Sequence, residues 1–162
     1  MRHGETIDNV RQVMQGQRPG ELNATGISQA EAVRDALACE HIDAVVSSDL
    51  RRAVQTANIV RQPHGLSLCT TPLLRERDWG SFTGRFIPDL RNAEWPPDVE
   101  PLETLFERAQ RFVSFIRNNY RGQRVLAVGH GIVNKAIQSV VLNQPMKEVP
   151  KMANAEIRRL VL

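Results

Sequence analysis

Four stretches of the chain carry apolar residues at the three- and four-residue spacing of an amphipathic helix. The spacing is clear after Glu103, where Leu105, Ala109, Phe112 and Ile116 fall on one helical face. Each of these stretches therefore predicts a helix that buries one side against the rest of the protein. The predicted helices cover residues 27–40, 49–60, 103–120 and 132–142.

Short apolar runs separate these helices and predict buried strands. The runs at 42–46 and 125–128 end in polar or glycine residues and lead into a helix, as strands of parallel sheets do. The alternation predicts an α/β fold: a single domain over residues 1–162, with a mainly parallel central sheet flanked by helices. The predicted strands are 42–46, 68–74, 125–128 and 156–162.

Residues 78–101 interrupt this alternation. Glycine and proline recur there so often that no helical or strand periodicity survives. We therefore expect a short cap insertion that lies over a functional site. The residues that break the pattern are Gly80, Gly84, Pro88, Pro96, Pro97 and Pro101.

The composition excludes several classes of protein. Hydrophobic residues make up 41% of the 162 positions, yet no apolar run approaches the roughly 20 residues that cross a bilayer. The net charge is +3, the basic residues are scattered and aromatic residues are only 5%, so nucleic-acid binding is not expected. Cys39 and Cys69 lack metal-binding spacing, and we expect both to be reduced and packed. No secretory signal leads the chain, which predicts a cytoplasmic protein without membrane partners.

Four positions carry side chains suited to catalysis. His3 follows Arg2, and a histidine beside an arginine suits a nucleophile whose incoming oxyanion needs charge compensation. Arg52 and His130 each follow a predicted strand, where α/β folds collect ligand-binding groups. Glu76 lies near a tryptophan, a setting that can keep a carboxyl protonated for general acid catalysis. Taken singly, each has an ordinary structural reading as a surface, turn or helix-start residue.

In combination and in this order, the motifs resemble those of the histidine phosphatase superfamily, the phosphoglycerate mutase-like or two-histidine phosphatases. The resemblance covers nearly the whole chain, and it is specific only because the motifs occur together. The motifs that carry it are Arg2-His3-Gly4-Glu5-Thr6 with Asn9, Met14-Gln15-Gly16 before Leu22-Asn23 and Gly26, the block from Ser47 to Ala57, Leu74-Arg75-Glu76, and Gly129-His130-Gly131.

The resemblance implies a role for each matched residue. His3 corresponds to the nucleophile that takes the phosphoryl group, His130 to its opposing partner, and Glu76 to the proton donor. Arg2 and Arg52 would neutralise the phosphoryl oxygens through charge-assisted hydrogen bonds. The matched phosphate-binding positions also include Asn9, which would donate from the edge of the pocket, together with Gln15 and Gly16.

These roles predict a metal-independent phosphomonoesterase that acts on a small phosphorylated substrate through a phosphohistidine on His3. No cofactor is implied, and no cluster of residues at metal-ligand spacing competes with the two histidines. Two alternatives stay open: phosphoryl transfer of the cofactor-dependent phosphoglycerate mutase type, and a catalytically silent phosphoryl-binding module. The sequence also allows a homodimer, because nothing in it reports the oligomeric state.

Two departures from the family pattern bear on these expectations. Relatives carry a core strand directly before Arg2, whereas only Met1 precedes it here, so we expect the natural chain to be longer. The cap is short and holds only Arg85 and Arg91 as isolated arginines, which favours hydrolysis over mutase chemistry. The run at 79–84 resembles that of broad-specificity and α-ribazole phosphatase-like members, without identifying the substrate.

Overall fold

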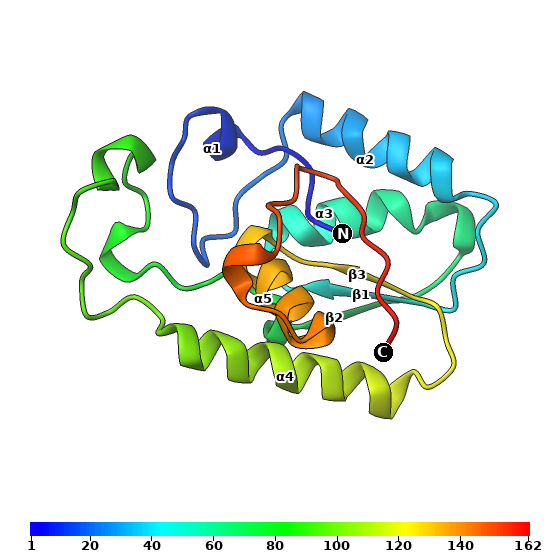
Figure 1. The fold of residues 1–162 in the computed structure, drawn as a ribbon. Coiled ribbons are helices and arrows are strands. Elements are labelled where there is room, and N and C mark those ends of the chain that lie inside the picture. Colours follow the sequence, from blue (N-terminus) through cyan, green and yellow to red (C-terminus); the bar gives the residue numbers. More distant parts are fainter.

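The computed structural model describes residues 1–162, and three parallel strands form the centre of its α/β fold (Figure 1). The strands are β1 (Ala44–Ser48), β2 (Leu68–Thr71) and β3 (Val125–Val128), in the order β2-β1-β3. Val46 of β1 lies opposite Cys69 of β2 and Ala127 of β3. Because the strands are parallel, their carboxyl ends meet at one edge of the sheet, where α/β folds place their sites.

All four predicted helices are present, with boundaries that differ from the prediction by no more than three residues. A fifth helix, α1, is a single turn that the periodicity did not show. A capping box formed by Thr6 and Asn9 caps its N-terminus. The helices are α1 (Ile7–Val10), α2 (Ala24–Leu37), α3 (Arg51–Val60), α4 (Leu102–Asn119) and α5 (Gly131–Leu142).

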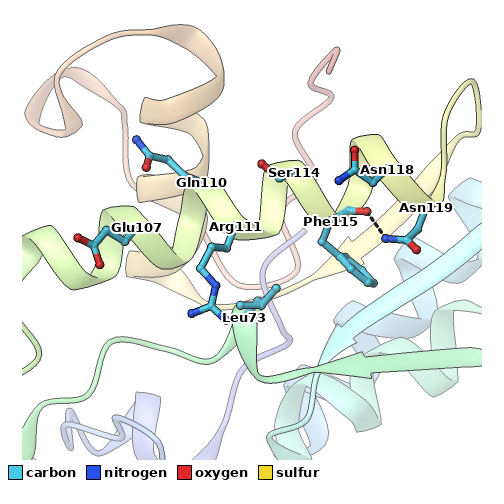
Figure 2. Close-up of a pocket in the computed structure, with 8 residues that line it drawn as sticks. All are labelled: Leu73, Glu107, Gln110, Arg111, Ser114, Phe115, Asn118 and Asn119. Carbon is cyan, nitrogen blue, oxygen red and sulfur yellow. Dashed lines mark hydrogen bonds between the residues drawn. The ribbon is translucent and has the colours of Figure 1, made fainter.

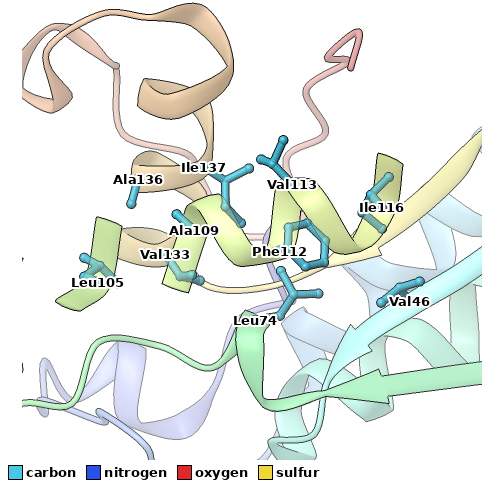
Figure 3. Close-up of a cluster of buried hydrophobic side chains, with 10 residues drawn as sticks. All are labelled: Val46, Leu74, Leu105, Ala109, Phe112, Val113, Ile116, Val133, Ala136 and Ile137. Carbon is cyan, nitrogen blue, oxygen red and sulfur yellow. The ribbon is translucent and has the colours of Figure 1, made fainter. Parts of the chain in front are cut away.

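Two apolar clusters cover the two faces of the sheet. Because adjacent strand residues point to opposite faces, Val45 and Val46 of β1 belong to different clusters. Val45 packs with α2 and α3, whose contribution is mostly small residues such as Ala30 and Ala57. Val46 packs with α4 and α5 (Figure 3). The cluster around Val46, on the side of α4 and α5, consists of Val46, Leu74, Leu105, Ala109, Phe112, Val113, Ile116, Val133, Ala136 and Ile137.

The predicted strand at 156–162 is wrong, since no strand forms there. Its backbone hydrogen bonds to another segment of the chain are confined to the start, beside Arg2 and His3: Arg2 N donates to Glu156 O (3.0 Å), and Ala155 N, just before the segment, donates to His3 O (3.0 Å). Two hydrogen bonds do not define a strand, because strand geometry depends on a continuous ladder with a neighbour. The predicted strand at 68–74 is also too long; Pro72–Leu74 turns away as a 3₁₀ helix.

The first residues of the chain run parallel to β3. Gly129 N donates to Met1 O and His3 N donates to Gly129 O, so the backbone of His3 is fixed beside the end of β3. The Met1 ammonium donates to Ala127 O at 2.5 Å, and its burial lowers the pKa of this amine to about 5. This short pairing is what attaches His3 to the sheet.

Residues 78–101 form an irregular segment with two 3₁₀ turns, Gly80–Phe82 and Ile87–Leu90. A small apolar cluster of Phe82, Leu90 and Val99 lies within it. Gly80 has a φ of +50°, and a side chain there would overlap Asp98, whose carboxylate accepts from Ser81 N at 2.8 Å. The segment is therefore held by local contacts rather than by a regular element, and three backbone hydrogen bonds at Gly84, Arg85 and Ile87 tie it to residues 12–14.

Two further observations bear on the sequence-based expectations. Cys39 is exposed, which corrects the expectation that both cysteines are packed, since it lies in the turn that follows α2. Cys69 lies half-buried in β2 against the cluster on α4 and α5. None of the helices combines the length and the apolar character needed to cross a bilayer.

Candidate active site

Two histidines from opposite ends of the chain meet at the carboxyl edge of the sheet. The ring centroids of His3 and His130 are 5.0 Å apart. Both side chains are buried, at 2% and 0% exposure. His3 reaches this edge because its backbone pairs with Gly129, and His130 because it is the N-cap of α5 directly after β3. The same backbone bonds thus hold both rings.

The hydrogen bond of His3 to its neighbour defines which ring nitrogen is reactive. Nδ1 lies 2.7 Å from Gly4 O, so Nδ1 carries the proton and Nε2 keeps its lone pair. Nε2 accepts from Arg52 Nε at 3.3 Å. Burial, and then the positive charge of Arg52, hold the pKa of His3 well below its usual value. At neutral pH the imidazole is therefore uncharged, as a nucleophile must be.

Arg52, on the first turn of α3, connects the two histidines. Its single Nε–H is shared between His3 Nε2 (3.3 Å) and His130 Nδ1 (3.1 Å). Its Nη groups donate to the carbonyls of Arg18 (2.6 Å) and Gly16 (2.8 Å). Burial lowers the pKa of Arg52 to about 10, an effect that the carboxylate of Glu76 opposes. The guanidinium stays charged and is fixed in one orientation.

Arg51, the adjacent residue, lies outside the site. Its guanidinium is exposed and pairs with Glu21 at 2.6 Å. Of the two adjacent arginines, only Arg52 points inward, as the resemblance implied.

Two buried N–H groups of the site have no acceptor. His130 Nδ1 accepts from Arg52, so His130 Nε2 carries the proton, and it contacts no partner. Arg2 Nε is the second unpartnered donor, although Arg2 Nη1 is held by Met152 O at 2.7 Å. Buried donors are rarely left unsatisfied in folded proteins, and here both lie in a region made electropositive by two guanidinium groups. This arrangement suits an oxyanion such as a phosphoryl group.

Glu76 is held at the N-terminus of α5. Its Oε1 accepts from the backbone N–H groups of Arg77 (2.9 Å), Ile132 (3.1 Å) and Val133 (3.1 Å). Oε2 accepts from Ile132 N alone, at 3.2 Å. A Cβ atom at Gly131 would lie 3.6 Å from Oε2 and 3.7 Å from Arg2 Nε. The less engaged carboxyl oxygen therefore borders the same space as the unpartnered arginine donor.

The three remaining predicted residues surround this centre. Gly16 is in direct contact with it, because its carbonyl accepts from Arg52 and its φ is +51°. Asn9 and Gln15 both reach it through Thr6, whose hydroxyl is 3.0 Å from Asn9 Oδ1 and 3.1 Å from Gln15 Oε1. The oxygens of both amides are thus engaged within the protein.

One residue next to the site was missed by the sequence analysis. Arg108 donates to the backbone carbonyls of the loop that carries Glu76. Its helical position, three residues after Leu105 at the border of the apolar face of α4, is the signal that could have indicated a half-buried arginine.

A surface hollow on α4 does not coincide with the histidines. It has a volume of about 680 Å³ and lies along the outer side of α4 (Figure 2). It contains no histidine, and it is open and lined mainly by polar side chains. Its lining residues are Leu73, Glu107, Gln110, Arg111, Ser114, Phe115, Asn118 and Asn119. No group of three His, Cys, Asp or Glu side chains in the structure is placed to hold a metal ion.

Comparison with known proteins identifies the class. The family model of the histidine phosphatase superfamily, branch 1, matches residues 1–162, and the chain belongs to this superfamily. The Proteus mirabilis protein "Probable phosphoglycerate mutase GpmB" is 35% identical over 159 residues, covering 90% of this chain and 74% of its own. The Bacillus subtilis protein "Uncharacterized phosphatase PhoE" is 31% identical over 160 residues, covering 96% of this chain and 82% of its own.

Solved structures with phosphatase names share the fold. The alpha-ribazole phosphatase from Shigella flexneri superposes with a TM-score of 0.86 at 26% identity, over 96% of this chain and 85% of that one. A mycobacterial glucosyl-3-phosphoglycerate phosphatase, solved with VO₃, superposes with a TM-score of 0.85 at 29% identity, over 95% and 87%. The chain is thus similar to phosphatases and to phosphoglycerate mutase-like proteins.

Proposed function

We propose that this protein is a metal-independent phosphomonoesterase that hydrolyses small phosphorylated metabolites through a phosphohistidine on His3. The observation that carries the proposal is the pair of buried, unpartnered N–H groups, Arg2 Nε and His130 Nε2, beside the neutral imidazole of His3. The lone pair of His3 Nε2 accepts only a long hydrogen bond from Arg52 Nε, which His130 Nδ1 shares. A phosphoryl group at this position would accept from both donors while its phosphorus faces His3 Nε2.

In the first step, the lone pair of His3 Nε2 forms the N–P bond while the bond from phosphorus to the leaving oxygen breaks. The developing alkoxide takes a proton from Glu76, for which Oε2 is the available oxygen because Oε1 accepts three backbone N–H groups. Arg2, Arg52 and His130 compensate the charge on the transferring oxygens.

In the second step, water attacks the phosphorus and gives its proton to Glu76. The electron pair of the N–P bond returns to His3 Nε2, and inorganic phosphate leaves. The carboxyl is thereby ready for the next cycle, because it has regained the proton that it gave to the leaving group. Asn9, Gln15 and Gly16 would complete the phosphate-binding wall, with Asn9 donating through its free amide nitrogen.

Hydrolysis is favoured over mutase chemistry by the cap. Residues 78–101 form a short segment in which Trp95 contacts Trp79 at a tilt and Phe82 edge-on. The guanidinium of Arg77, just before the segment, lies 4.9 Å and 5.0 Å from the ring centroids of Trp79 and Trp95. One arginine of the segment, Arg85, lies 5.7 Å from the ring of Phe82. The segment thus lacks the arginine pair that a second phosphate of a mutase cofactor requires, as the resemblance implied.

The test is hydrolysis of p-nitrophenyl phosphate in excess EDTA by the protein and by its His3→Ala variant, with Arg51→Lys as the matched control. We expect turnover in EDTA that is lost in His3→Ala and kept in Arg51→Lys, together with an acid-labile, base-stable phosphoprotein in quenched reactions. Transfer of the trapped phosphoryl group to 3-phosphoglycerate in preference to water would establish the mutase instead. Absence of both turnover and phosphoprotein in the folded protein would leave the silent binding module.

A further inference from the structure

Arg108 of α4 uses all five of its N–H groups next to the loop that carries Glu76. Nε and Nη2 form a bidentate pair with Glu100, at 3.0 and 2.8 Å. Nη1 donates to Leu73 O (3.1 Å) and Arg75 O (2.6 Å), and Nη2 also donates to Glu76 O (3.4 Å). A single guanidinium therefore holds three backbone carbonyls within four consecutive residues, and the last of these belongs to Glu76 itself.

Glu100 holds the same loop on the other side of Glu76. Its Oε2 accepts from Asp78 N at 3.0 Å, and its own N–H donates to Asp78 O at 2.9 Å. Its carbonyl oxygen accepts from Arg77 Nε at 2.8 Å. The ion pair between Arg108 and Glu100 thus fixes the backbone immediately before and immediately after Glu76.

The ion pair between Arg108 and Glu100 is so deeply buried that its net contribution to the stability of the fold is small. The side chains of Arg108 and Glu100 are only 14% and 9% exposed, and desolvation of such a pair offsets much of its attraction. Lysine could keep the charge but has three donors on a single nitrogen, so it cannot form the bidentate pair and hold the carbonyls as well. The planar guanidinium of arginine, with five N–H groups, is therefore needed to form this set of hydrogen bonds.

We propose that Arg108, supported by Glu100, is a positioning residue that aims the carboxyl of Glu76 at the leaving oxygen of the substrate; this rests on the proposed function. The carboxyl accepts hydrogen bonds of 3.1–3.2 Å from backbone N–H groups at the start of α5, while the backbone carbonyl of Glu76 accepts from Arg108 of α4. Both ends of the side chain are thus attached to helices, and a shift of the loop moves Oε2 relative to the scissile bond.

The test exploits the dependence of kcat/KM on the leaving group. This constant reports phosphoryl transfer to His3, and proton donation matters most when the leaving oxygen is strongly basic. For Arg108→Lys we expect a loss of about tenfold or more with phenyl phosphate and an alkyl phosphate, but less than about threefold with p-nitrophenyl phosphate. Arg111→Lys, an exposed arginine one turn further along α4, should leave all three values unchanged.

A double mutant separates the inference from the proposed function. If Arg108 acts through Glu76, the effect of Arg108→Lys that depends on the leaving group should vanish in a Glu76→Gln background. A uniform loss on all substrates, or an undiminished effect in Glu76→Gln, would overturn the positioning role. A Glu76→Gln variant that loses no more activity with basic than with acidic leaving groups would instead overturn the proposed acid. Circular dichroism and urea unfolding exclude misfolded variants, and Glu100→Gln provides a second, independent perturbation of the loop.

Discussion

At the scale of single residues, the site depends on how one N–H group is shared. The N–H group at Arg52 Nε lies between His3 Nε2 and His130 Nδ1, and both nitrogens accept from it. The ring proton is therefore on Nδ1 in His3 and on Nε2 in His130. The remaining N–H groups of Arg52 are bound to carbonyls of the loop around Gly16. The guanidinium therefore defines the hydrogen-bonding state of both rings as well as their charge environment.

This geometry predicts a large difference between two neighbouring arginines. Arg52→Lys should lower kcat/KM by roughly 100-fold, because an ammonium cannot bridge both histidines and the loop carbonyls. Arg51→Lys should stay within about twofold, because Arg51 contacts only Glu21 on the surface. Steady-state kinetics on p-nitrophenyl phosphate measures both variants. Comparable losses in the two would contradict the assignment of Arg52 to the phosphate site.

The buried histidines also predict an acid-sensitive fold. Burial keeps the pKa of His3 and of His130 well below the usual value, so the unfolded chain takes up protons near pH 6.5 that the folded chain does not. The free energy of unfolding should therefore fall as the pH drops below 6.5, by about 1 kcal/mol per histidine between pH 7.5 and 5.5. Urea unfolding at these two pH values measures the loss.

Two variants test this prediction, one at the buried His130 and one at the exposed His41. His130→Gln should remove one histidine's share of the loss, about 1 kcal/mol between pH 7.5 and 5.5, and leave the shares of His3 and of the buried Met1 amine. Substitution of the exposed His41 by Gln should leave the whole loss intact. Asp49, whose pKa is lowered chiefly by its hydrogen bond from Arg75, loses stabilisation only at lower pH and does not contribute in this window. Identical pH dependence in all three proteins would show that the two buried rings are not responsible.

At the scale of elements, the start of α2 is docked on the segment that carries His3. Asn23 caps the helix by accepting from Gly26 N at 2.7 Å, and its amide donates to Glu5 Oε1 at 2.8 Å. A side chain at Gly4 would overlap the backbone of Gly26, and a side chain at Gly26 would overlap the backbone of Glu5. The position of the nucleophile thus depends on two backbones that approach without side chains between them.

Gly26→Ala should therefore destabilise the protein by roughly 2–3 kcal/mol and lower activity, because the added methyl would overlap the backbone of Glu5. Gly65→Ala is the matched control: Gly65 has a φ of +62° but no atom within 4 Å of the added methyl. The strain of that backbone should cost about 1 kcal/mol without loss of kcat/KM. Chemical unfolding together with kinetics compares the two, and equal effects would refute a specific contact at Gly26.

At the scale of the whole molecule, the sheet brings together segments that are far apart in the chain. Residues 2–3, 52, 76 and 130 all lie at or just beyond strand ends or helix starts on one edge, with α2 and α3 on one face and α4 and α5 on the other (Figure 1). The site is therefore formed only when both helical layers are in place. A ligand that fills the site should in turn stabilise the whole fold.

Vanadate should raise the Tm in the presence of EDTA, because an oxyanion would satisfy the unpartnered donors of Arg2 and His130. At one hundred times its Kd the stabilisation is about 2.7 kcal/mol, or a shift of roughly 5–10 °C for a chain of this size. Differential scanning fluorimetry measures the shift. Arg2→Gln should reduce it markedly, and sodium chloride at matched ionic strength should give none; equal shifts in both proteins would argue against the site.

The sequence by itself determined most of the local structure and the superfamily, and it predicted the candidate site residues. Helical spacing is a local property, which is why α4 was predicted to within one residue at each end. The motif around His3 and the one around His130 indicated the superfamily, since their residue types are dictated by phosphoryl chemistry. The spacing of α1 was missed because a single capped turn is too short to show a period.

Only the tertiary structure decided the features that depend on distant partners. The segment from Glu156 onward has strand-like residues, but its backbone pairs with the neighbouring residues 2–3 only at its start, so no ladder forms. The protonated nitrogen of each histidine follows from contacts with Gly4 and Arg52. The attachment of Glu76 to two helices also depends on residues that the chain separates by more than twenty positions. Such contacts are set by packing, and no periodicity in the sequence encodes them.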